Sequence, residues 1–364
     1  MIKQHWWKAL GVGLILYTLI CGLSVPIKPA LIDAAARTIS TAKSGDALTL
    51  TATGYNTFFK QNTTLNVWLA VEDSARTQGG KPDIYPIRAA AVHVLDETHL
   101  EATFNLPKFL PLSKKLVDAN LVLDGNHDGF LIRKTIVQVS QDSVDVAAGK
   151  QLWAADMDIA PHAKTFTFPD LQFTRETIRN TFFHVPMWFV MFTLYGLGLW
   201  YSIQYLRKQN MMSDLKAVSF TRVGTFFGLL GLATGGTWAN FAWGQPFPIQ
   251  EIKLLMTYTA LAIYFAYFIL RLSFDDFERR ARISAVYSIF SFASLVPLLY
   301  VIPKLANASS HPGNGGNSSI AAQDMENTMR LVFYPACIGW ILLGLWVATL
   351  VVRSEILKEK VLSR

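Results

Sequence analysis

The stretch Phe183-His-Val-Pro-Met-Trp-Phe-Val begins an apolar run that continues to Ile203. An α-helix rises about 1.5 Å per residue, so roughly 20 apolar residues cross the hydrocarbon core of a membrane. The run therefore predicts a transmembrane helix. Its second residue is a histidine, a side chain that is costly at the edge of an apolar segment unless it has a partner.

Five further runs have the same character. They cover approximately residues 6–25, 224–242, 252–270, 283–302 and 331–352. With 51% hydrophobic and 16% charged residues, the chain is too apolar for an ordinary soluble protein. We predict a mostly α-helical membrane protein with a bundle of six transmembrane helices. A cleaved signal sequence is the alternative for the first run, but no small-x-small site follows it cleanly, so we expect an anchor.

The distribution of Lys and Arg predicts the orientation, because these residues accumulate on the cytoplasmic side. One set of loops, together with the tail, is basic: Arg207, Lys208, Lys216, Arg222, Arg271, Arg279, Arg280, Arg282, Arg353, Lys358, Lys360 and Arg364. The opposite loops carry only Lys304. Both termini are therefore expected in the cytoplasm. The net charge of +7 reflects topology and contact with membrane lipid, and we expect no nucleic-acid partner.

Residues 28–179 differ from the rest in being polar with alternating apolar positions. Examples are Ala47-Leu-Thr-Leu-Thr-Ala, Leu65-Asn-Val-Trp-Leu-Ala-Val and Phe130-Leu-Ile-Arg-Lys-Thr-Ile-Val-Gln-Val, with turn signals at Gly79-Gly80, Asp124-Gly125 and Asp128-Gly129. This pattern predicts an inserted extracytoplasmic β-sandwich-like domain. Its histidines, His93, His99, His127 and His162, lack metal-ligand spacing, so each is expected to be solvated or packed in the core.

These features predict four parts of the chain. They are an N-terminal anchor (1–27), a periplasmic β-rich domain (28–179), a five-helix membrane domain (180–353) and a cytoplasmic tail (354–364). Cys21 and Cys337 both lie inside apolar runs and form no CxxC motif, which argues against thiol transfer and a disulfide framework. Lipidation of Cys21 is disfavoured by the large Ile20 before it.

His184 and His311 are the candidate metal ligands. His311 opens the loop His-Pro-Gly-Asn-Gly-Gly-Asn, and the orientation above places both histidines at the outer membrane face. Gly and Asn let a backbone wrap closely around a bulky group, although any exposed turn has a similar composition. Alone, each histidine is more simply an interfacial residue. As a pair they indicate two axial ligands for one haem iron.

Aromatic and basic residues accompany the two histidines. Trp238 and Trp243 lie in Thr237-Trp-Ala-Asn-Phe-Ala-Trp-Gly-Gln-Pro-Phe-Pro and offer faces for a flat macrocycle, while Lys304 or Arg330 offers a cation for its propionates. The alternatives are ordinary: tryptophans also form interfacial belts, and basic side chains also anchor helix ends.

The order of these motifs, followed by Asn327-Thr-Met-Arg-Leu-Val-Phe-Tyr-Pro-Ala, resembles the cytochrome c maturation protein C (CcmC) family. The resemblance covers the first span and residues 176–352. It implies non-covalent haem b at the periplasmic face of the bacterial inner membrane, with His184 and His311 as axial ligands and Trp238 and Trp243 in the platform. It also implies a handling protein instead of an enzyme. The partners would be a CcmE-like periplasmic haem chaperone and other maturation subunits in the membrane, including a separate ATP-binding chain.

The chain departs from the family at one motif. The family segment reads Trp-Gly-x-x-Trp-x-Trp-Asp, whereas Trp243-Gly-Gln-Pro-Phe-Pro-Ile-Gln-Glu loses the later tryptophans and the aspartate. Phe247 offers an aromatic face there and Glu251 a carboxylate. Two other functions stay open: a cytochrome c haem lyase of the same superfamily, and a membrane scaffold or permease without haem. The task of the β insert also stays open, either as a docking module or as a domain without a separate role.

Overall fold

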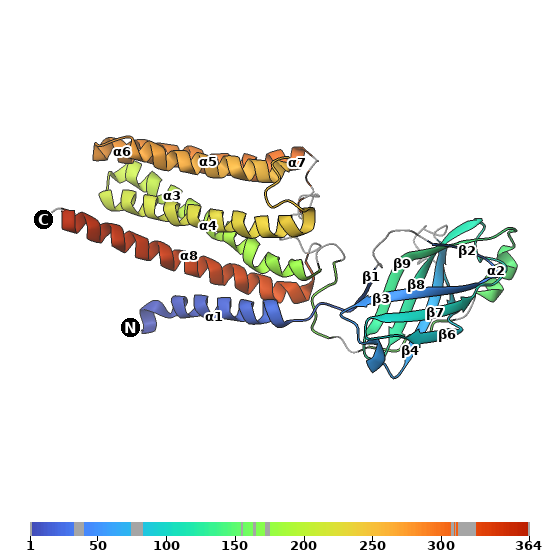
Figure 1. The fold of residues 1–364 in the computed structure, drawn as a ribbon. Coiled ribbons are helices and arrows are strands. Elements are labelled where there is room, and N and C mark those ends of the chain that lie inside the picture. The colour runs from blue at the N-terminus through green and yellow to red at the C-terminus, as the bar shows by residue number, and fades with distance from the viewer. Residues whose placement is uncertain are drawn as a thin grey trace. The chain divides into compact units, whose positions relative to one another are not determined.

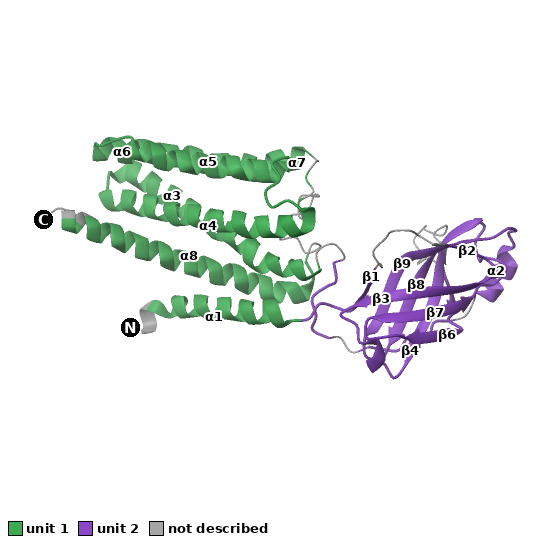
Figure 2. Cartoon of the chain, in the orientation of Figure 1, with its two compact units in different colours: residues 1–25, 173–364 green, residues 26–172 purple. Residues whose placement is uncertain are grey.

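A computed structural model describes residues 2–32, 40–73, 83–153, 156–162, 165–171, 175–306, 309, 311 and 325–362. The chain divides into two compact units (Figure 2). Unit 1 contains residues 1–25 and 173–364, and unit 2 contains residues 26–172. The chain thus leaves unit 1 after Val25 and returns to it at Phe173.

Unit 1 is a bundle of long helices in which the start of α1 and the end of α8 lie at the same end of the bundle (Figure 1). The long helices are α1 (Ile2–Ser24), α3 (Thr181–Lys208), α4 (Met211–Trp243), α5 (Ile252–Leu272), α6 (Phe277–Val296) and α8 (Asn327–Leu362). Shorter pieces are η3 (Arg175–Asn180), η4 (Pro297–Val301) and α7 (Ile302–Leu305). Within the described ranges, six helical stretches are long and apolar enough to cross a membrane, as the sequence predicts.

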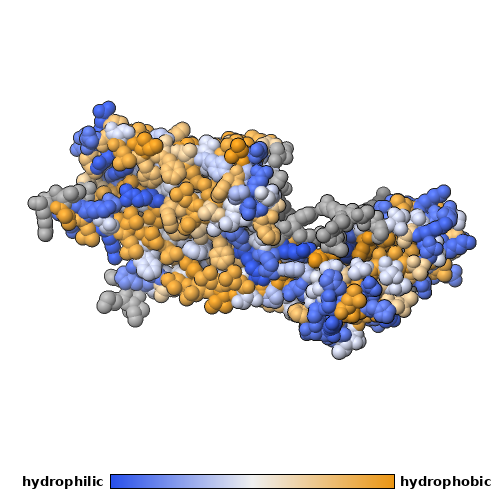
Figure 3. Space-filling model, in the orientation of Figure 1, coloured by the Kyte–Doolittle hydropathy of each residue, from blue (hydrophilic) through white to orange (hydrophobic). Residues whose placement is uncertain are grey.

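Hydrophobic side chains cover much of the visible face of unit 1 (Figure 3). Large apolar residues on several helices are exposed, among them Ile20 at 64%, Phe226 at 55% and Ile269 at 67%. Exposed apolar surface on this scale suits contact with lipid tails, which hide it from water. The helical unit is therefore a membrane domain.

Helix α3 lies at the centre of the bundle. It packs most extensively on α4 and also contacts α6 and α8. One side of α3 shares a core with α4 and α8 through Met187, Val190 and Leu194. Another side uses Met191 and Tyr195 against α5 and α6. A residue near the start of α3 is consequently held by neighbours on several sides.

Some helices are longer than their apolar runs. Helix α4 begins at Met211, well before residue 224, because polar residues in its first turns have partners. The Asn210 side chain accepts a hydrogen bond from Met212 N at 3.0 Å, a standard N-cap. The buried Asp214 carboxylate binds the Arg271 guanidinium of α5, with Nη1 and Oδ1 2.8 Å apart. Paired polar groups of this kind extend a helix beyond its hydrophobic segment.

Two prolines modify the helices. Helix α3 begins at Thr181, before the apolar run that starts at Phe183, and Pro186 is its sixth residue. The preceding turn η3 runs directly into the helix, which moves its start upstream. Pro297 begins the π-helical turn η4 between α6 and α7.

Unit 2 contains two β-sheets. Their strands are β1 (Ala30–Ile32), β2 (Ser40–Lys43), β3 (Ala47–Tyr55), β4 (Leu65–Asp73), β5 (Asp83–Arg88), β6 (Ala91–Val94), β7 (His99–Asn105), β8 (Leu116–Gly125) and β9 (Gly129–Ser140). The sheet orders are β1-β3-β7-β6 and β2-β9-β8-β4-β5. Short helical pieces η1 (Phe59–Gln61) and α2 (Val146–Leu152) accompany them. The alternating segments at residues 47, 65 and 130 correspond to β3, β4 and β9.

Inward-facing residues of both sheets form one hydrophobic core. Members include Leu50 and Phe104 from the first sheet and Leu69, Leu121 and Val137 from the second. Two sheets that bury one face each exclude water from a shared interior, which is the main stabilising term for such a domain. A separate β domain in a helical membrane protein is therefore confirmed. The turn signal Gly79-Gly80 lies outside the described residues.

Candidate functional site

His184 is fixed by hydrogen bonds from the fourth position of α3. Its Nδ1 lies 3.0 Å from the Gly231 carbonyl oxygen and 3.2 Å from Thr234 Oγ1, both on α4. A carbonyl only accepts, so Nδ1 carries the proton and Nε2 carries the lone pair. Metal-binding histidines characteristically donate their second N–H to a carbonyl or carboxylate in this way. The imidazole is thus held in the tautomer that a metal ligand requires.

Glycines of α4 let α3 approach closely enough for this contact. A Cβ atom at Gly235 would lie 2.7 Å from His184 Cε1, and one at Gly231 would lie 2.8 Å from the Trp188 ring. Side chains at these positions would push both rings away from α4. Gly231 and Gly235 therefore leave space for the His184 imidazole and the Trp188 indole between α3 and α4.

Trp188 is hydrogen-bonded to the lone pair on Nε2 of His184. The Trp188 Nε1–H donates to His184 Nε2 at 3.2 Å, one helical turn along α3. The two rings are nearly perpendicular, with centroids 5.9 Å apart. One nitrogen lone pair cannot serve a hydrogen bond and a metal bond together, so Trp188 and a metal compete for His184.

Trp238 and Trp243 lie in the last turns of α4 and contact each other edge to face, with ring centroids 5.0 Å apart. The helix ends directly after Trp243 because Gly244 adopts a positive φ of 72° and donates its N–H to the Asn240 carbonyl at 3.0 Å. Glycine takes this left-handed conformation without the steric cost that a Cβ imposes. The Trp-Gly pair therefore has a structural reason: the glycine stops the helix where the two indoles meet.

His311 joins this cluster from a distant part of the chain. Its ring centroid lies 6.2 Å from that of Trp238, 6.3 Å from that of Trp243 and 6.4 Å from that of His184. The structure thus brings together the four residues predicted as ligands and platform. The segment that follows His311, Pro-Gly-Asn-Gly-Gly-Asn, lies outside the described residues.

The spacing of the two imidazoles suits one metal ion. A metal–imidazole nitrogen distance of about 2 Å on each side implies ring centroids about 6 Å apart, and the observed separation is 6.4 Å. Within the described part of the chain, no group of three or more His, Cys, Asp and Glu side chains is placed to hold a metal. Two histidines alone suit haem iron, because the porphyrin supplies the other four nitrogens. The residues present therefore fit haem.

Two other candidates lie differently. Phe247 packs on Gly236 of α4, and its side chain is 52% exposed. Arg330 lies in the first turn of α8, where its Nη1 donates to Asn327 Oδ1 at 3.2 Å. Phe247 is thus adjacent in sequence to the tryptophan pair and accessible. The main-chain N–H of Arg330 donates to the Glu326 carbonyl oxygen at 3.1 Å.

Several residues of this site were missed from the sequence. Gly231 and Gly235 were read only as part of an apolar span, and Trp188 only as an apolar residue. Ser309 also contributes: its hydroxyl donates to the Glu251 carboxylate and accepts from His311 N at 3.2 Å. The spacing of His184 and Trp188 by one helical turn is the one signal that was available for the indole contact.

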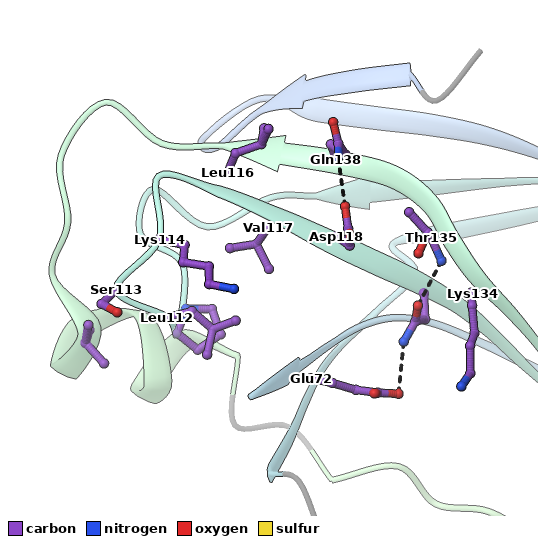
Figure 4. Close-up of a pocket in the computed structure, with 13 residues that line it drawn as sticks. Glu72, Leu112, Ser113, Lys114, Leu116, Val117, Asp118, Lys134, Thr135 and Gln138 are labelled. Atoms are coloured by element: carbon purple, nitrogen blue, oxygen red, sulfur yellow. Dashed lines mark hydrogen bonds between the residues drawn. The ribbon is translucent and has the colours of Figure 1, made fainter. Parts of the chain in front are cut away.

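Unit 2 has its own cavity of about 580 Å³, with Lys114, Asp118 and Thr135 among its lining residues (Figure 4). Its polar groups bond to one another: Gln138 Nε2 donates to Asp118 Oδ1 at 2.8 Å, and Thr135 N donates to Asn120 Oδ1 at 2.9 Å. His99, His127 and His162 of this unit pair with neighbouring carboxylates, as His99 does with Asp96 at 2.9 Å. We assign no ligand to unit 2.

Comparison with known families gives a match over most of the helical part of the chain. The sequence profile of the family described as heme exporter protein C (CcmC) matches residues 137–364, which is more than half of the chain. The matched region contains α3 to α8 and hence all six candidate site residues. It begins within β9, so α1 and strands β1 to β8 precede it. No curated protein matches the chain.

Proposed function

Because the chain belongs to the CcmC family, we propose that it binds haem between His184 and His311 and passes it to a periplasmic haem chaperone. The family handles haem during c-type cytochrome biogenesis and works with other maturation components. One observation carries the proposal for this chain: two histidines and two tryptophans from three separate segments gather with ring centroids 5.0 to 6.4 Å apart.

The site favours carrying haem over catalysis on it. Two imidazoles fill both axial positions of the iron and leave no open position for oxygen or a substrate. Trp238 and Trp243 supply the aromatic platform, with Phe247 beside them, and Arg330 is the proposed partner of a propionate. The bound group is non-covalent haem b. Energy for release, where ATP hydrolysis supplies it, comes from a separate ATP-binding chain.

The proposed setting is the bacterial inner membrane. The start of α1 and the end of α8 lie at the end of unit 1 that carries the basic loops, and basic loops face the cytoplasm. His184, Trp243 and His311 then face the periplasm. Residues 28–179 form an extracytoplasmic sandwich-like domain between the anchor (1–27) and the five-helix domain (180–353), and residues 354–364 form the cytoplasmic tail.

The Trp188 hydrogen bond gives the carrier a route for release. Haem binding displaces the indole N–H from His184 Nε2, and the same N–H takes the lone pair back when haem leaves. A neutral hydrogen bond contributes about 0.5–1.5 kcal/mol. This exchange lowers the affinity for haem without removing a ligand, which suits a protein that must give up its cargo.

Replacing Trp188 with phenylalanine is expected to tighten haem binding roughly two- to tenfold, because the competing hydrogen bond of about 1 kcal/mol is lost. The measurement is the equilibrium haem affinity of the detergent-purified protein in competition with a haem scavenger. Trp200→Phe on the same helix is the matched control, since Trp200 is 56% exposed. A haem affinity unchanged or lowered by Trp188→Phe would contradict the competition.

A transfer assay tests the proposed function against the lyase alternative. Haem-loaded protein is mixed with a purified periplasmic haem chaperone or, separately, with an apocytochrome peptide that contains CxxCH. We expect haem to move to the chaperone and to remain extractable from the peptide mixture. Covalent attachment to the peptide by this protein alone would support the lyase instead. Failure to bind any haem would favour the scaffold or permease.

A further inference from the structure

His311 is held by a link of two hydrogen bonds that begins at its main chain. The His311 N–H donates to Ser309 Oγ at 3.2 Å, and the Ser309 hydroxyl donates to Oε1 of Glu251. Ser309 and His311 belong to the connection between α7 and α8, whereas Glu251 immediately precedes α5. The link therefore ties the second histidine to a different helix.

Glu251 is a fixed point for this link. It is 9% exposed, and its carbonyl oxygen accepts from Leu255 N at 2.9 Å in the first turn of α5. Its own N–H donates to the Pro248 carbonyl at 3.3 Å. A buried carboxylate requires hydrogen-bond partners, and the Ser309 hydroxyl supplies one. The main chain of Glu251 is thus held in place at the start of α5.

The link matters because His311 has no helix or strand to carry it. An imidazole on an untethered segment would lose conformational entropy each time it bound a metal, and this loss weakens binding. Holding the backbone next to the imidazole removes part of that cost. Partners that orient a ligand in this way typically change metal affinity about 10- to 100-fold.

We propose that Glu251, acting through Ser309, is a positioning residue that holds His311 beside Trp238 and Trp243 and opposite His184. This inference rests on the proposed haem function. It gives the carboxylate at the end of the altered tryptophan segment a defined role: the carboxylate orients the second ligand instead of extending the aromatic platform. Neither Glu251 nor Ser309 contacts the metal.

The test uses the full-length protein in detergent with added ferric haem, and it compares Ser309→Ala and Glu251→Ala with wild type. We expect both variants to keep haem through His184 but to shift it from six-coordinate low-spin to five-coordinate high-spin absorption. Their affinity should fall about tenfold. Added imidazole should restore the low-spin spectrum, because it replaces the misplaced ligand and does not repair a damaged fold.

Two conservative variants sharpen the comparison. Glu251→Gln retains an oxygen that accepts from Ser309 and should remain largely low-spin. Ser294→Ala removes an exposed serine whose hydroxyl bonds only within α6, to Phe290 O at 2.9 Å, and should match wild type. Glu251→Gln thus tests whether the negative charge matters apart from the hydrogen bond. Ser294→Ala tests whether loss of an unrelated serine hydroxyl changes the spectrum.

The possible failures are distinguishable. If wild type binds haem as a low-spin complex and Ser309→Ala and Glu251→Ala do the same with equal affinity, the positioning role is wrong and the proposed function survives. If either variant loses the low-spin spectrum and imidazole does not restore it, the link is structural and the positioning role is again overturned. If wild type itself binds no haem, the proposed function fails and the inference fails with it.

Discussion

His184→Ala and His311→Ala are each expected to lower haem affinity by about 100-fold or more, since even partners that only orient a metal ligand contribute about 10- to 100-fold. Each variant removes one of two rings whose centroids lie 6.4 Å apart. The remaining histidine leaves the iron five-coordinate and high-spin. Haem content after purification and the optical spectrum of reconstituted protein measure the two effects separately.

Histidines of unit 2 provide the control for this prediction. His162 bonds to the Asp124 carboxylate, and His93 lies exposed on β6. His93→Ala and His162→Ala should leave haem content and spectrum unchanged. A normal low-spin spectrum in His184→Ala or His311→Ala, or an altered one in a unit 2 variant, would mean that the ligands are assigned to the wrong residues.

Asp214→Ala is expected to cause the largest loss of stability, about 3–5 kcal/mol, because it leaves the Arg271 charge buried without its partner. The side chains of the pair are 3% and 12% exposed, and Arg271 Nη1 lies 2.8 Å from Asp214 Oδ1. The pair joins α4 to α5. Thermal unfolding in detergent should show a midpoint lower by roughly 10 °C.

Two further variants test the cause of this loss. Asp214→Ala combined with Arg271→Met removes both charges and should recover much of the stability, since uncharged replacements of a buried pair are often neutral. Arg222→Ala breaks a more exposed pair with Glu355, where Arg222 is 51% exposed, and should cost less than about 1 kcal/mol. Equal losses in Asp214→Ala and Arg222→Ala would contradict the role of burial.

The membrane architecture was predictable because hydropathy and segment length can be calculated from consecutive residues alone. Hydropathy and length identify the six spans without any knowledge of packing. Alternation identifies β3, β4 and β9 for the same reason, since one face of each sheet must be buried. The apolar run at 224–242 does not reveal that α4 begins at Met211, because hydropathy does not show that Asp214 pairs with Arg271 on another helix.

Some residues of the site were likewise predictable from the sequence and others were not. His184, Trp238, Trp243 and His311 were predictable because imidazoles and indoles at a membrane surface are conspicuous and follow a family order. The residues that orient these four side chains were not predictable from the sequence. Gly231 and Gly235 act by lacking a side chain, and Ser309 acts through a hydrogen bond to a residue 58 positions away in the chain. Such roles depend on three-dimensional contacts, which sequence patterns do not report.

The optical and electron paramagnetic resonance spectra of the purified wild-type protein with one equivalent of haem test the central claim most directly. Coordination by His184 and His311 predicts a six-coordinate low-spin ferric complex that remains six-coordinate on reduction. A high-spin complex, or no binding above that of the His184→Ala/His311→Ala double variant, would show that the two imidazoles do not share a haem iron.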